Sequence, residues 1–290
     1  MSAAAGDMPS AAGSASPARR GPGRAIGGRA RRLAGDLLPP AVVFVVVIVG
    51  WELVIGMLGI KSFILPKPSE ILAALQANWD VGYSIRPAAQ ASLIEAVGGF
   101  VIGTMAGVAV AFASARWLSA RNALLPLAVA AGAIPIIAFA PLMNNWFGVL
   151  SPLSKMMMAA VLVFFPVMAN VTRGLTQVEP SALELLRSYA ATDSEILRKV
   201  RVPNALPYFF TALKLATTLA LIGAIVGEYF GGVSLVLGRI IVQSASSLKF
   251  DATWGAIVMA AIAGIVFYLI VAAVERLVIP WHASVRGDVS

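Results

Sequence analysis

The sequence predicts an all-α integral membrane protein with six membrane-spanning helices. Two observations lead to this prediction: its composition and the length of its apolar runs. Of the 290 residues, 59% are hydrophobic and only 12% are charged, whereas soluble domains average about 45–50% apolar and about 25% charged residues. The apolar residues form continuous runs of roughly 20, the length of a membrane-spanning helix, without the alternation of an outer-membrane strand. An ordinary cytosolic enzyme is therefore excluded.

The N-terminal residues 1–35 differ in composition from the rest of the chain. They are mainly Ala, Gly, Ser, Pro and Arg, so burial cannot offset the entropy of ordering them, and we expect a disordered basic cytoplasmic tail. The apolar run that follows has no convincing small-residue cleavage site, which favours a retained anchor over a secretory signal. The transmembrane domain is predicted over residues 36–280, and residues 281–290 form a second cytoplasmic tail.

Six apolar segments are long enough to cross a hydrocarbon core of roughly 30 Å at about 1.5 Å per residue. They cover approximately residues 40–60, 87–113, 122–142, 155–173, 205–230 and 253–275. Pro126, Pro135 and Pro166 lie inside or near the third and fourth segments, where packed membrane helices tolerate proline as a kink.

Lysine and arginine residues indicate the orientation, because they gather in the cytoplasmic loops of membrane proteins. With the N-terminus inside, 15 of them lie on the cytoplasmic side and 6 on the outside, while Lys214 falls within the fifth segment. The outside residues are Lys61, Lys67, Arg86, Lys155, Arg239 and Lys249. Both termini are therefore predicted to be cytoplasmic. The net charge of +8 follows from this topology, and we expect no nucleic-acid partner.

The sequence offers few ligands for a metal or a cofactor. It contains no cysteine and a single histidine, His282, near the C-terminus. Zinc-thiolate sites, disulfides and thiol nucleophiles are thus excluded, and a lone histidine at such a position is expected on the surface. We expect no metal site, no catalytic residue and no cofactor on this chain.

The segment at residues 174–204 has helical patterning of its own and is too long for a simple connector. Pro180 can open a first helix, and Thr192 with Glu195 three residues later matches a capping box that begins a second. Both predicted helices are amphipathic, with a break at about residues 190–192. Either the segment only anchors the loop at the membrane surface, or it is a docking element for a cytoplasmic partner.

Several charged side chains lie within the apolar segments. Such a group costs on the order of 2.5–3.5 kcal/mol at the bilayer centre and usually faces protein or water. Glu52 and Glu95 are expected to form structural hydrogen bonds between helices. Lys214 lies near the inner end of the fifth segment, where its ammonium group is expected to extend to the membrane surface.

Polar residues near the outer ends of the segments have two interpretations. Glu228 lies near the outer end of the fifth segment, where it is either a translocation pathway or gate residue or an interfacial charge. Asn144 and Asn145, at the outer edge of the third segment, have the same two interpretations.

Glycines recur at every fourth position in two segments. One set is Gly99, Gly103 and Gly107, and the other is Gly223, Gly227 and Gly231. This spacing lets helix backbones approach closely, so helix packing is the first interpretation of both sets. For the fifth segment, the alternative is a sliding surface in a conformational cycle.

The segment at about 180–203 resembles the cytoplasmic signature of the permease subunits of ATP-binding cassette (ABC) importers. That signature is Glu-Ala-Ala, three residues, Gly, nine residues and Ile-x-Leu-Pro. When the two are aligned on Pro203, the spacings and Glu184 match, but leucines replace the alanine pair and Ala190 replaces the glycine. Because a Cβ disfavours positive φ, the replacement of this glycine by alanine argues against a left-handed conformation at the bend, while alanine still allows a simple change of helix direction. The resemblance implies these ATPase-coupling residues: Glu184, Leu185, Leu186, Ala190, Thr192, Asp193, Val200 and Pro203.

The resemblance extends over about residues 40–280 and points to the nitrate/sulfonate/taurine branch of these permeases. It includes LPKPSEIL after the first segment, Trp51-Glu52, WFG at 146–148 and the run from 205 to 231. The stretch from 139 to 175 is similar to members paired with binding proteins for pyrimidine precursors or riboflavin. The implied substrate is a small organic solute or anion, either sulfonate-, taurine- or nitrate-like, or a pyrimidine thiamine precursor or riboflavin.

The resemblance also implies an architecture and partners. The fold would be the type I ABC importer permease fold in a bacterial cytoplasmic membrane. The partners would be a cytoplasmic ABC ATPase dimer, a second permease copy in a homodimer, an extracytoplasmic substrate-binding protein and membrane lipid. No GxxxxGK[ST] loop occurs in the sequence, so a partner would hydrolyse ATP. The alternatives are a stand-alone secondary transporter or channel, which should show inverted repeats, and a membrane-anchored scaffold.

Overall fold

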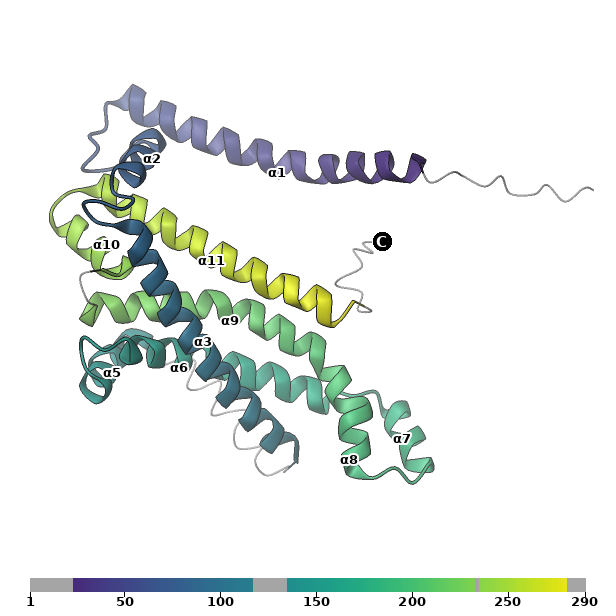
Figure 1. Cartoon of the computed structure of the whole chain (residues 1–290). Coiled ribbons are helices and arrows are strands. Elements are labelled where there is room, and N and C mark those ends of the chain that lie inside the picture. Colours follow the sequence, from purple (N-terminus) through teal and green to yellow (C-terminus); the bar gives the residue numbers. More distant parts are fainter. Residues whose placement is uncertain (1–22, 117–134, 233–234, 281–290) are drawn as a thin grey trace, which may run out of the picture. The chain divides into compact units, whose positions relative to one another are not determined.

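The structure is a computed structural model that describes residues 23–116, 135–232 and 235–280. Every regular element within these ranges is a helix, and no strand occurs among them (Figure 1). Five of the helices are long and apolar enough to cross a membrane. The prediction of an all-α integral membrane protein is therefore confirmed for the described part of the chain.

The chain divides into two units, residues 1–54 and residues 55–290. The described part of the first unit is a single helix, and the second unit contains the remaining elements. In chain order the elements are α1 (Gly23–Leu58), α2 (Pro68–Ala77), α3 (Ile85–Arg116), the 3-10 turn η1 (Ile136–Phe139), α5 (Ala140–Phe147), α6 (Pro152–Thr176), α7 (Pro180–Ser188), α8 (Asp193–Ile196), the π-helical turn η2 (Leu197–Arg201), α9 (Val202–Gly231), α10 (Leu237–Ser246) and α11 (Phe250–Val278).

The five apolar helices α1, α3, α6, α9 and α11 correspond to the first, second, fourth, fifth and sixth predicted spans. The predicted third span at 122–142 lies mostly outside the described residues. Its described end forms η1 and the start of α5. A sixth spanning helix therefore stays a prediction.

The N-terminal helix begins earlier than the sequence analysis predicted. A disordered tail was expected over residues 1–35, whereas α1 begins at Gly23. The residues from 24 to 35 include several alanines and arginines, which are good helix formers. They extend an existing apolar helix, so the cost of a new helix nucleus does not arise. The expectations for residues 1–22 and 281–290 lie outside the described residues.

The core of the second unit is formed by α6, which packs against both α3 and α9. Its buried valines, Val163, Val167 and Val171, face alanines of the neighbouring helices, such as Ala216 and Ala220 of α9. Small residues let membrane helices approach closely, which strengthens van der Waals packing where lipid removes the hydrophobic driving force. The α3–α6–α9 core is therefore stabilised by close van der Waals packing between helices.

The short helix α10 packs against α3, α9 and α11, at the end of the unit where α9 ends and α11 begins (Figure 1). Its Leu237 and Ile240 are buried against Ile85 and Ala88 of α3 and against Ala256 of α11. The polar residues of α10, including Arg239 and Gln243, are exposed. This helix thus closes one end of the α3–α9–α11 side of the bundle.

Candidate functional site

The residues of the ABC permease signature lie in the α7–α8 segment, residues 180–201. Within the part of the chain that the structure describes, α7 buries none of its residues. Glu184 is exposed, and Leu185 and Tyr189, which are one helical turn apart, have 57% and 76% of their surface uncovered. An exposed pair of large apolar side chains of this kind is typical of a protein-binding site.

The bend between α7 and α8 is left-handed. Ala190 has a φ of +53°, whereas the sequence predicted a simple change of helix direction. The Ala190 N–H donates to Arg187 O at 2.9 Å, and the Ala191 N–H donates to Leu186 O at 3.0 Å. This pair of bonds is a Schellman motif, which satisfies the last carbonyls of α7. Two such bonds, worth about 0.5–1.5 kcal/mol each, offset the cost of about 1–2 kcal/mol that a Cβ imposes at positive φ.

The second helix of the segment begins as the sequence predicted. Thr192 Oγ1 accepts the N–H of Glu195 at 3.3 Å, and Glu195 Oε2 accepts the N–H of Thr192 at 2.9 Å. These reciprocal bonds are the predicted capping box. Asp193, in the first turn, is exposed. The bend and the cap together fix the angle between α7 and α8.

The chain continues from α8 into α9 without a loop. The helical path from Asp193 to Gly231 is 39 residues long and includes the π-helical turn η2, which contains Val200. Pro203 follows directly in the first turn of α9. A proline has no N–H for the helical pattern, and a π turn is one of the ways in which a helix adjusts around such a gap.

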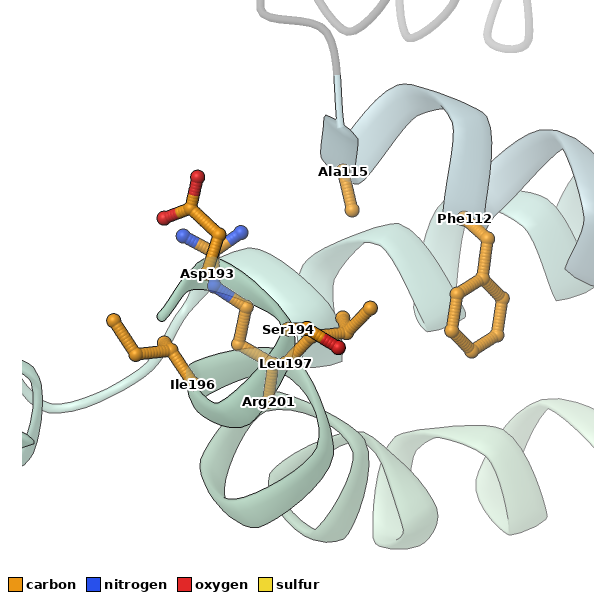
Figure 2. A pocket seen from close by; sticks show the side chains of 7 residues that line it. All are labelled: Phe112, Ala115, Asp193, Ser194, Ile196, Leu197 and Arg201. Carbon is orange, nitrogen blue, oxygen red and sulfur yellow. The ribbon is translucent and has the colours of Figure 1, made fainter. Parts of the chain in front are cut away.

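A pocket of about 450 Å³ separates the end of α3 from the start of this helical path (Figure 2). Phe112 and Ala115 of α3 line one side, and the other side is lined by Asp193, Ser194, Ile196, Leu197 and Arg201. In Figure 2 the ring of Phe112 and the methyl group of Ala115 face the α8 side chains across this space. Within the described residues, α8 therefore has little direct support from α3.

The predicted pathway residues have different environments. Glu228 is fully buried, and its Oε2 accepts the N–H of Gly238 at 2.6 Å. Asn144 is buried too and donates from Nδ2 to Phe230 O at 3.3 Å, whereas Asn145 is exposed. The structure thus brings Glu228 and Asn144 to the same end of α9, inside the protein, and leaves Asn145 on the surface.

Five of the six glycines of the two sets face α6. A methyl group at Gly103 would lie 2.5 Å from Ala160 O, and one at Gly223 would lie 2.6 Å from the Cα of Ala159. Gly231 faces Asn144, whose Nδ2 would be 2.8 Å from an added methyl group. The other three that approach α6 are Gly99, Gly107 and Gly227. Both α3 and α9 therefore use glycine to approach the same central helix.

The sequence did not predict two polar features of the structure, the burial of Lys155 and the ion pair of Lys214. Lys155 was counted among the outside charges, but it is only 1% exposed. Lys214 was expected to reach the membrane surface, but its Nζ pairs with Glu275 Oε2 of α11 at 2.7 Å. The only sequence signal for this pair was a second charge, Glu275, at a similar depth of the last apolar segment. Lys155 gave no such signal, because it lies close to the end of its segment.

Replacing Ala190 with glycine is expected to stabilise the chain. Glycine adopts positive φ without the Cβ cost, but it also gains entropy in the unfolded state, so the expected gain is about 0.5–1 kcal/mol. This corresponds to a rise of about 1–4 °C in the midpoint of thermal unfolding, measured on the purified protein in detergent. The matched control is Ala182→Gly inside α7, which should lower the midpoint because glycine weakens a helix interior. A fall for Ala190→Gly as large as for the control would contradict the left-handed bend.

The chain was compared with known proteins. Residues 99–282 match the family described as binding-protein-dependent transport system inner membrane component. A probable ABC transporter permease protein of Haemophilus influenzae is 31% identical over 77% of this chain and 89% of its own length. A formylaminopyrimidine transport permease of Halalkalibacterium halodurans is 29% identical over 84% of this chain and 96% of its own length. A riboflavin transport system permease of Chloroflexus aurantiacus is 29% identical over 84% of this chain and 90% of its own length. Permeases named for aliphatic sulfonate, taurine and nitrate transport match as well.

Proposed function

The chain belongs to the binding-protein-dependent transport system inner membrane component family, and we propose that a separate cytoplasmic ATPase drives it through the α7–α8 segment. As a member of the nitrate/sulfonate/taurine branch, it is the multi-pass inner-membrane permease subunit of an ABC importer. Membership of this family argues against the alternative functions of a stand-alone secondary transporter, a channel or a scaffold. The observation that carries the proposal is the uncovered surface of Glu184, Leu185 and Tyr189.

The α7–α8 segment has the properties of a docking element. Its exposed face is held in one orientation by the bend at Ala190 and by the Thr192–Glu195 capping box. A surface fixed in this way loses little conformational entropy when a partner binds. The helical path to α9 gives a bound ATPase direct mechanical access to a spanning helix. Glu184, Leu185, Leu186, Ala190, Thr192, Asp193, Val200 and Pro203 are thus proposed as coupling residues, either at the contact or in the bend and joint behind it.

The proposed topology has six spanning helices, with both termini in the cytoplasm. It is supported by the excess of cytoplasmic Lys and Arg residues, 15 against 6, and by the rule that such residues remain inside. In this orientation α7 and α8 face the cytoplasm, and α10 lies on the extracytoplasmic side. Because Lys155 is buried in the protein, it is not an exposed charge of the outside loops, and the excess of cytoplasmic Lys and Arg residues among the exposed charges is larger still.

The proposed assembly has two permease copies, a cytoplasmic ATPase dimer and an extracytoplasmic binding protein, with no cofactor on this chain. The family description, which names a binding-protein-dependent system, supports the last of these partners. The proposed substrate is a small organic solute or anion. Relatives named for formylaminopyrimidine and riboflavin transport are each 29% identical to this chain, whereas the Bacillus subtilis sulfonate permease and the taurine and nitrate permeases are 27%, 24% and 25% identical. This difference favours a heteroaromatic solute over a sulfonate or nitrate. Calorimetric titration of the cognate binding protein with riboflavin, a formylaminopyrimidine, taurine and nitrate tests this choice.

Replacing Glu184 with arginine is expected to uncouple transport. Loss of a central contact residue costs about 2 kcal/mol or more, so the affinity of the permease for its ATPase should fall by about 30-fold. The measurements are substrate uptake into proteoliposomes and binding of the ATPase to the purified permease. The matched control is Glu179→Arg, an equal charge reversal at an exposed position just before α7, which should leave both values unchanged. Normal uptake by Glu184→Arg at normal protein levels would overturn the proposal.

A further inference from the structure

A buried lysine lies at the end of the bundle where α6 begins and α9 ends. Lys155 is 1% exposed, and its Nζ donates to the carbonyl oxygens of Val149 and Ser151 in the turn that precedes α6. Gly227 of α9 makes room for its aliphatic chain, because a methyl group there would lie 3.1 Å from Lys155 Cγ. The lysine therefore lies inside the α6–α9 contact, with its charge withdrawn from water.

Two buried carboxyl groups share this region with the lysine. Glu95 of α3 and Glu228 of α9 are 5% and 0% exposed. Glu228 directly follows Gly227, which packs against Lys155. Lys155 attracts both carboxyl groups electrostatically, and the two carboxyl groups also interact with each other. Three ionisable groups from three spanning helices thus form one group, here named the Lys155 cluster (Lys155, Glu95 and Glu228). Charges in such a place are costly and are usually tied to function.

The Lys155 cluster also holds the start of α10. Glu228 Oε2 accepts the N–H of Gly238, and Ser92 Oγ accepts the N–H of Leu237 at 2.9 Å. A carboxylate at a helix N-terminus satisfies free N–H groups and complements the helix dipole. Only glycine fits at position 238, because a methyl group there would lie 2.7 Å from Glu228 Cβ. As a result, α10 is attached to α9 through Glu228 and to α3 through Ser92.

The arrangement leaves some of its polar atoms unsatisfied. Glu95 Oε2 and Glu228 Oε1 are buried without a hydrogen-bond partner among the residues that the structure describes. A partly satisfied buried network has a higher free energy than one whose members are all paired. The Lys155 cluster is therefore not fully hydrogen-bonded in this conformation.

We propose that the Lys155 cluster consists of positioning residues for transport, which make α10 an extracytoplasmic gate that moves with α9. This inference rests on the proposed function and the proposed orientation. When α9 shifts along α6 at Gly223 and Gly227, Glu228 moves with it relative to Lys155 and takes the start of α10 along. The attraction between Lys155 and Glu228 thus favours one state of the gate over the other.

The test uses the complete transporter in nanodiscs, with its ATPase and binding protein. Because the chain has no cysteine, a single reporter cysteine at exposed Val242 of α10 measures the state of the gate through its rate of maleimide labelling. The rate is compared without nucleotide and with ATP under trapping conditions. The variants are Glu228→Gln, which keeps an acceptor for the Gly238 N–H, Lys155→Met, and the two together. The matched control is Lys249→Met, an exposed lysine outside the Lys155 cluster.

For the parent protein and for Lys249→Met, we expect the labelling rate to differ between the two states. Couplings between sites are typically about 5–150-fold, so each single variant should lose at least about fivefold in uptake and should lose the state dependence of labelling. The double variant should recover part of what Lys155→Met loses, because it leaves one buried carboxyl group, Glu95, without the lysine, whereas Lys155→Met leaves two. Ser92→Ala removes the link from α3 without changing a charge, and it should loosen α10 in both states.

The inference is overturned if the single variants keep the state dependence of labelling, or if the double variant is no better than Lys155→Met. If a charge variant does not fold, the test relies on Ser92→Ala. Labelling rates of Ser92→Ala that equal those of the parent protein in both states would overturn the inference. Failure of the proposed function has a different signature, because the parent chain would then not bind an ATPase at all.

Discussion

Replacing Lys214 with methionine is expected to lower the free energy of unfolding by about 3–5 kcal/mol, the usual cost of leaving a buried charge without its partner. Lys214 Nζ and Glu275 Oε2 are 2.7 Å apart, and their side chains are 23% and 8% exposed. Methionine keeps most of the lysine's volume, so packing changes little while Glu275 loses its cation. The measurement is the unfolding midpoint of the purified protein in detergent, followed by tryptophan fluorescence.

Two controls separate the loss of the ion pair from a general effect of lysine removal. Lys199→Met breaks the exposed pair between Lys199 and Glu195, whose side chains are 61% and 44% exposed, and should change the unfolding midpoint far less than Lys214→Met, because solvent screens an exposed pair. The double variant Lys214→Met/Glu275→Gln removes both charges and should recover most of the stability lost. Equal effects of Lys214→Met and Lys199→Met would show that the pair between α9 and α11 contributes nothing.

The second large effect is expected at the contact between α3 and α6. Gly103→Ala places a methyl group 2.5 Å from Ala160 O and 2.8 Å from Val163 Cβ. Because backbone atoms cannot move aside as a flexible side chain can, the two helices must separate. Such overpacking costs about 1–3 kcal/mol, which exceeds the gain of about 1 kcal/mol in helix propensity.

The matched control for this variant is Gly255→Ala in α11. A methyl group at Gly255 would meet its nearest atoms at 3.7 Å, an ordinary van der Waals distance, so the same substitution should be neutral or stabilising. The comparison uses thermal unfolding and the yield of monodisperse protein after extraction. Equal stability of the two variants would argue against a close approach of α3 to α6.

The sequence was sufficient for the features that depend on local rules. An apolar run of about 20 residues has few alternatives to a spanning helix, so five spans are found where they were predicted. The capping box at Thr192 depends only on residues three positions apart, and it too is present. In contrast, the left-handed bend depends on a balance between the Cβ of Ala190 and the bonds to Arg187 and Leu186. Whether these hydrogen bonds form depends on the conformation of the surrounding backbone, which the residue type at position 190 does not determine.

Features made by distant parts of the chain were not predictable from one sequence. The burial of Lys155 depends on carboxyl groups from α3 and α9, which lie about 60 to 70 residues away along the chain. Glycine spacing predicts a close-packing face, but it does not name the helix that packs there. Only the structure brings glycines of both α3 and α9 to α6. Intervals along the sequence do not specify which helices become neighbours.

The unbroken helical path from Asp193 to Gly231 acts mechanically as a lever arm. Its 39 residues have a contour length of roughly 58 Å at about 1.5 Å per residue. One end adjoins the proposed ATPase contact on α7 across the bend at Ala190, and the other contains Glu228, which holds α10. Beyond that bend, a force at the cytoplasmic end meets no loop that would absorb it. The regular α-helical hydrogen-bond pattern of this lever is interrupted at the η2 turn and at the two prolines, Pro203 and Pro207, so the stiffness of these positions affects how much of an ATPase movement reaches the far side of the membrane.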